Sequence, residues 1–142
     1  MVDITKYAVS ETSTLHLKDA AGNLLFEKDA EGRDDPSKPV EVELYGPGSK
    51  EHAQANAKRS SRNIQRLRKK GNMELSADDM ATEGAEYLAA ITKGFNNLEY
   101  PGKTGVEMFK AVYSNRQLGF IADQVQEHIG DWENFTKGSA TS

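Results

Sequence analysis

The chain of 142 residues contains no cysteine and only one tryptophan, and aromatic residues make up 8% of it. The lack of cysteine excludes disulfide bonds, thiolate metal sites and thiol catalysis, and it suits a reducing cytoplasm. No run of about 18 apolar residues is present, so we expect no membrane-spanning helix. The opening residues, MVDITKYAVS, lack the apolar stretch of a secretory signal.

Positive charge is scarce except in one segment. The net charge is −4, and the segment 50–70 contains eight lysines and arginines against one acid, Glu51. This segment therefore carries +7, and the rest of the chain must carry −11. A nucleic-acid-binding domain usually has a basic net charge over the whole domain. An acidic partner, or the acidic remainder of this chain, is an equally available counterpart for the basic segment.

Alternating apolar and polar residues predict three strands in the first part of the chain. The first lies around 15–17, a turn follows at 19–23, and a second short strand follows at 24–26. The charged segment 31–39 contains two prolines and is expected to be a loop. The third strand, 40–45, alternates cleanly, and we expect it to be a sheet edge to which a partner strand could add.

After Gly46 the apolar spacing changes to that of a helix. The first predicted helix begins after Ser49 and ends at Gly71, residue types that cap helices. Its stripe of small and aliphatic side chains is expected to pack against the protein, and it consists of Ala53, Ala57, Ser60, Ile64 and Leu67. Its cations are expected to form an outward-facing row, which consists of Lys58, Arg62, Arg66 and Lys70, with Arg59 beside it.

Three further helices are predicted. Ser76 begins the second helix, whose apolar face continues from Met80 to Phe95. Thr104 and Ser114 have capping-box spacing and are expected to begin the third and fourth helices.

These elements predict an α+β fold, in which a small N-terminal three-stranded antiparallel sheet is followed by about four helices. We expect a single domain, 1–142, with a β-rich part at 12–46 and a helical part at 49–135. The polar residues 136–142 are expected to form a disordered tail.

The sequence offers no convergent catalytic pattern. The three histidines, His16, His52 and His128, lie far apart and lack the spacing of metal ligands. The GPGSK segment at 46–50 lacks the four-residue spacer and the Gly-Lys-Ser/Thr ending of a P-loop. We therefore expect no enzyme activity, no catalytic or metal-binding residue and no cofactor.

The basic row has three interpretations, which we rank in the order solvated face, protein-docking face and nucleic-acid contact. A row of cations can contact phosphates. No aromatic residue is interleaved with it for base stacking, so the nucleic-acid interpretation ranks last. For protein docking, the candidate residues are Arg59, Arg62 and Arg66.

Three stretches resemble the tail assembly chaperones of long-tailed bacteriophages. They are YGPGSKEHAQANAKRSSRNIQRLRKKG at 45–71, ATEGAEYLAAIT…FNNLEY within 81–100, and SNRQLGFIADQVQEHIGDWENF at 114–135. The resemblance implies a non-enzymatic protein of the host cell cytoplasm that is absent from the mature virion. It also implies binding to the tape measure protein, which is kept soluble, and recruitment of tail tube protein subunits around it.

Two aromatic residues, Trp132 and Phe135, complete the candidate partner-binding set, because aromatic side chains are enriched at binding hot spots. Self-association of the chain also remains open. Two alternatives stand beside the chaperone. One is a small nucleic-acid-binding or regulatory protein that uses the basic helix 58–70, and the other is a minor tail or connector component of the virion.

Overall fold

The computed structural model describes residues 1–71 and 75–136, apart from the side chain of Lys70. Its strands are β1 (Thr12–His16), β2 (Phe26–Lys28), β3 (Asp34–Pro39), β4 (Glu41–Tyr45) and β5 (Thr92–Asn96). Its α-helices are α1 (Lys50–Lys70), α2 (Ala77–Ala90), α3 (Gly105–Ser114) and α4 (Gly119–Ile129). Short 3₁₀ helices are η1 (Ile4–Tyr7), η2 (Arg116–Leu118) and η3 (Trp132–Phe135). The predicted α+β class is confirmed.

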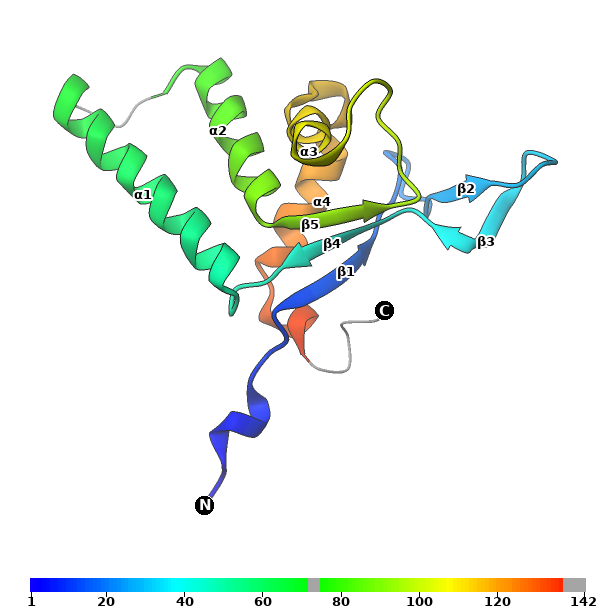
Figure 1. Cartoon of the computed structure of the whole chain (residues 1–142), viewed down its shortest axis with the longest axis horizontal. Helices are drawn as coiled ribbons and strands as arrows, with labels where there is room; N and C mark the ends of the chain where they lie inside the picture. The colour runs from blue at the N-terminus through cyan, green and yellow to red at the C-terminus, as the bar shows by residue number, and fades with distance from the viewer. Residues whose placement is uncertain (72–74, 137–142) are drawn as a thin grey trace.

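A three-stranded antiparallel sheet in the order β1-β4-β5 lies in the middle of the molecule (Figure 1). Val42 of β4 lies opposite Leu15 of β1 and Phe95 of β5. Because alternate residues of a strand share a face, Leu44 joins Val42 on the buried side, and both are 0% exposed. The same hydrophobic cluster contains buried side chains from α2, α3 and α4, among them Leu88, Val112 and Val125.

The position of β4 contradicts the prediction that residues 40–45 form a sheet edge. β4 is the central strand, since β5 pairs with it on the side away from β1. We predicted a helix as far as Phe95, but α2 ends at Ala90. The β-branched pair Ile91–Thr92 and Gly94 are weak helix formers. Thr92 and Gly94 pair with β4 instead, and the Ile91 carbonyl accepts a hydrogen bond from the Tyr45 N–H of that strand.

The predicted loop is also partly wrong, because Asp34–Pro39 forms β3 and pairs with β2 in a separate two-stranded sheet. Proline is tolerated there because a two-stranded sheet has only edge strands. The predicted turn at 19–23 is confirmed. The backbone N–H of Asp19 donates to the Asn23 carbonyl at 2.8 Å, and its carboxylate accepts from the backbone of Ala21.

Three of the four predicted helix starts are confirmed, at Ser49, Ser76 and Thr104, although the Thr104 side chain makes no capping hydrogen bond. The Ser49 and Ser76 hydroxyls accept hydrogen bonds from backbone N–H groups of the first turns of α1 and α2. The fourth helix begins later than predicted, at Gly119. Ser114 ends α3, and the Asn115 side chain caps η2 instead, because it accepts from the Gln117 N–H at 3.0 Å.

The end of the described chain returns to its beginning. Phe135 is 0% exposed, and its carbonyl accepts a hydrogen bond of 2.7 Å from the Ser10 N–H. Its ring packs on Gly46, where an added Cβ would lie 2.3 Å from the Phe135 Cδ2 atom. Glycine is therefore required at position 46, because the Phe135 ring lies too close for any side chain there. Apart from Thr136, the predicted disordered tail lies outside the described residues.

Candidate partner-binding surface

Helix α1 lies at one side of the molecule and is joined to the sheet only at its N-terminal end (Figure 1). Gly71, with φ of 73°, ends it in the left-handed conformation that glycine adopts without strain. Of the α1 side chains that the structure describes, Ala55 alone is buried. This helix is therefore held to the body by little apolar contact.

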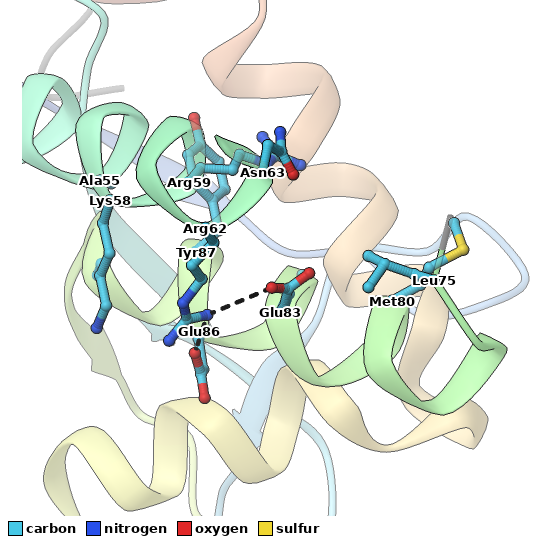
Figure 2. A pocket seen from close by; sticks show the side chains of 12 residues that line it. Ala55, Lys58, Arg59, Arg62, Asn63, Leu75, Met80, Glu83, Glu86 and Tyr87 are labelled. Atoms are coloured by element: carbon cyan, nitrogen blue, oxygen red, sulfur yellow. Dashed lines mark ion pairs between the residues drawn. The ribbon is translucent and has the colours of Figure 1, made fainter. Parts of the chain in front are cut away.

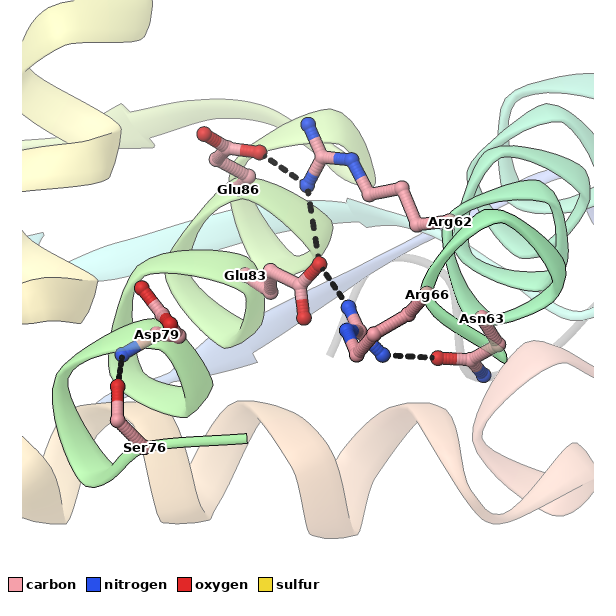
Figure 3. Close-up of polar contacts among 7 residues, drawn as sticks. All are labelled: Arg62, Asn63, Arg66, Ser76, Asp79, Glu83 and Glu86. Atoms are coloured by element: carbon pink, nitrogen blue, oxygen red, sulfur yellow. Dashed lines mark hydrogen bonds and ion pairs between the residues drawn. The ribbon is translucent and has the colours of Figure 1, made fainter. Parts of the chain in front are cut away.

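The contact between α1 and α2 is built mainly from ion pairs (Figure 3). Arg66 pairs with Glu83 and also donates to Asn63 Oδ1 at 2.7 Å. Arg62 pairs with Glu86 and lies 4.0 Å from Glu83. The side chain of Arg66 is only 9% exposed, so loss of its partner would leave a charge poorly solvated.

These pairs correct the prediction that Arg62 and Arg66 belong to an outward-facing row, since both point toward α2. The acidic part of the chain that meets them is α2, through Glu83 and Glu86, which the sequence interpretation missed. The sequence contains a pattern that could have indicated this contact. Residues three or four apart lie on the same face of a helix, so Glu83 and Glu86 can face Arg62 and Arg66 when the two helices pack antiparallel.

Arg59 is also held against α2. Its guanidinium carbon lies 4.3 Å from the centre of the Tyr87 ring, a cation–π contact. The Tyr87 hydroxyl lies 3.2 Å from His52 Nε2. Burial raises the pKa of Tyr87 and lowers that of His52, which favours the neutral form of both groups. These groups extend the polar contact between the two helices toward the N-terminal end of α1.

Beside the ion pairs, a cleft of about 180 Å³ opens between α1 and α2 (Figure 2). Its apolar lining includes Leu75, Met80 and Tyr87, and its charged lining includes Lys58 and Arg62. Ligand pockets commonly measure about 300–1,000 Å³. This cleft is therefore suited to a single side chain of a partner better than to a small-molecule substrate.

The apolar stripe of α1 faces outward, which contradicts the prediction that it packs against the protein. Ile64 and Leu67 are 51% and 49% exposed, and the small residues of the stripe, Ala53, Ala57 and Ser60, are exposed as well. The helix is turned this way because its ion pairs and Ala55 face α2. An exposed stripe of this kind is typical of a protein-binding surface.

At the base of α1, a groove of about 720 Å³ separates this helix from α4 and η3. Ala53 and Asn56 line it from α1, and Ile129 and Trp132 line it from the other side. Trp132 is 57% exposed, so a partner can contact it. Phe135 is fully buried, so our prediction that it contacts a partner is contradicted by its place in the core.

The exposed cations of α1 are fewer than the sequence indicates. Two members of the basic row are paired within the chain, and the side chain of Lys70 is not described. The α1 cations exposed within the described part of the chain are Lys50, Lys58, Arg59, Arg68 and Lys69. The nucleic-acid interpretation thus loses the arginines at the middle of its row.

The three histidines make separate contacts. His16 Nε2 lies 2.8 Å from the Leu25 carbonyl, and His128 Nε2 lies 3.0 Å from Ser13 Oγ. Within residues 1–71 and 75–136, no group of three or more histidine, aspartate or glutamate side chains could hold a metal ion. Burial lowers the pKa of His128, an effect that the nearby Asp131 only partly opposes.

Acidification is expected to destabilise the native state through His128. Its pKa is below the ordinary value of 6.5 when folded, so the unfolded chain binds the proton more readily. The stability that neutral His128 contributes to the native state is complete above pH 6.5, and it is lost as the pH falls through the folded pKa of this residue. His128→Gln can keep the Ser13 contact without titrating. Urea midpoints at several pH values should therefore fall less steeply for the variant than for the wild type, and equal slopes would contradict this role.

None of the helices in the described ranges is long and apolar enough to cross a membrane. The candidate surface consists of an exposed apolar stripe, a groove beside it and the cations of α1. No protein-family model matches the chain, and comparisons with curated proteins and with solved structures find no match.

Proposed function

We propose that the protein is a non-enzymatic phage tail assembly chaperone of the host cytoplasm. It binds the tape measure protein, keeps it soluble and recruits tail tube subunits to it. The observation that carries the proposal is the outward-facing apolar stripe on α1, with Ile64 and Leu67 each about half exposed. The sequence resemblance at 45–71, 81–100 and 114–135 supports it.

The physical requirements of such a chaperone agree with this surface. A long helical client exposes apolar stripes that aggregate in water, because apolar surface is driven to associate. A chaperone must cover these stripes without opening its own core. The stripe of α1 is already exposed, while the core between the sheet and helices α2, α3 and α4 stays closed.

Co-expression with the tape measure protein of the same genome tests the proposal. The soluble fraction of the tape measure protein should rise several-fold, and the two proteins should co-purify after nuclease treatment. Binding should survive raised salt, because apolar burial is not screened as ion pairs are. A tape measure protein that stays insoluble and fails to co-purify would refute the chaperone function.

Two measurements separate the alternatives. A chaperone should be absent from purified virions, whereas a minor tail or connector component would be present in every particle. A nucleic-acid-binding protein would bind duplex DNA with an affinity that falls steeply with salt. The pairing of Arg62 and Arg66 with α2 predicts weak DNA binding with a shallow salt dependence.

A further inference from the structure

The apolar stripe of α1 continues into the groove at the base of the helix. Ala53 belongs to both, because it is the first residue of the stripe and lines the groove with Trp132. From Ala53 to Leu67 the stripe extends about 21 Å, at about 1.5 Å per residue. We call this continuous area the stripe–groove surface, and it consists of Ala53, Ala57, Ser60, Ile64 and Leu67 with Ile129 and Trp132.

The spacing of the stripe indicates what could cover it. Its members follow one another at intervals of four, three, four and three residues. This is the heptad spacing of helices that pack side by side, in which side chains of one helix enter holes of the other. The small residues at its base, Ala53, Ala57 and Ser60, would let a second helix approach closely. Ile64 and Leu67 supply larger apolar contacts at the far end.

The charges beside the stripe indicate the sign of the partner. Lys50 and Arg68 are 18 residues apart, or about five turns, so they lie along the same edge of the stripe. No ion pair among the described residues involves either of them. Glu51 is the only acid between residues 50 and 70, and by helical spacing it lies on the α2 side. The edge is therefore cationic.

We infer that the stripe–groove surface binds one amphipathic helix of a protein partner, packed alongside α1. The partner helix carries bulky aliphatic residues at heptad spacing and acidic residues along the edge that faces Lys50 and Arg68. One of its ends lies in the groove beside Trp132. This inference rests on the proposed function only for the identity of the partner, which would then be a segment of the tape measure protein.

A synthetic helix tests the surface without the tape measure protein. The probe is a peptide of about 21 residues with leucine at heptad spacing, glutamate at the edges and no tryptophan. The chain has one tryptophan, so emission from Trp132 reports directly on the groove. We expect a blue shift on titration, and a matched peptide with lysine edges should bind about tenfold more weakly or worse.

Variants locate the binding site. Ile64→Glu with Leu67→Glu is expected to weaken binding of the glutamate-edged peptide about 100-fold, because two charges would lie in an apolar contact. Val106→Glu is the matched control, since Val106 is a 57% exposed aliphatic residue on α3. The affinity of this variant for the glutamate-edged peptide should equal that of the wild type. Arg68→Glu should reduce the ratio of the affinity for the glutamate-edged peptide to that for the lysine-edged peptide. A folding defect would not produce this change.

The outcomes separate this inference from the proposed function. If the stripe variant releases both the peptide and the tape measure protein, both proposals are supported. If the wild type binds the tape measure protein but not the peptide, or if the stripe variant binds both normally, the inference is overturned and the chaperone function stands. If the peptide binds as described and the tape measure protein does not, the inference stands and the chaperone function is refuted.

Discussion

Phe135→Ala is expected to lower the free energy of unfolding by about 3–5 kcal/mol, the range for truncating a buried phenylalanine. Its side chain is fully buried, and its ring centre lies 5.5 Å from that of His128. Urea denaturation followed by circular dichroism measures the loss. Trp132→Ala is the control from the same 3₁₀ helix, and it should cost less than about 1 kcal/mol because Trp132 is 57% exposed.

Gly46 provides an independent check on this packing. Gly46→Ala places a Cβ 2.3 Å from a ring carbon of Phe135, and overpacking of this kind costs about 1–3 kcal/mol. When Gly46→Ala is combined with Phe135→Ala, the clash disappears. The double variant should therefore lose less unfolding free energy than the sum of the losses in the two single variants. Strict additivity would mean that the ring does not pack on Gly46, and a small effect of Phe135→Ala would place this residue outside the core.

Local chemistry explains which parts of the fold could be predicted from the sequence. The hydroxyls of Ser49 and Ser76 act on backbone groups three residues away, so a short segment contains all the information. The strand β5 depends on pairing with β4, which lies far away in the sequence. Its residues were assigned to a helix because apolar periodicity in α2 continues by chance to Phe95, and tertiary pairing outweighed it.

The candidate surface shows a different limit. Periodicity correctly separates the stripe of α1 from its cations, but it does not show which side faces the protein. The prediction followed the rule that apolar residues lie inside, whereas Arg62 and Arg66 find charged partners on α2 and turn the helix around. Similarly, the sequence places Trp132 and Phe135 together, and only contacts with distant parts of the chain, such as that of the Phe135 ring with Gly46, show which of them is buried.

Arg66→Glu is expected to release α1 from α2. A carboxylate would then face Glu83 in a place where the native Arg66 side chain is only 9% exposed, and breaking such a pair costs up to about 3–5 kcal/mol. Because Ala55 is the only buried residue among the described side chains of α1, the helix should open locally while the core stays closed. Hydrogen exchange should accelerate about 100-fold or more in α1, but little in β4 and α4.

Two controls identify the pair as the cause. Arg68→Glu changes the same charge two residues later, at an exposed position without an ion pair in the described part of the chain, and should leave exchange in α1 nearly unchanged. Arg66→Glu combined with Glu83→Arg restores opposite charges and should recover much of the protection. Equal acceleration by Arg66→Glu and Arg68→Glu would show that the total charge of α1, rather than this contact, holds the helix in place. If the pair does hold it, Arg66→Glu should also separate the stripe from the groove, so that a bound helix no longer shifts the emission of Trp132.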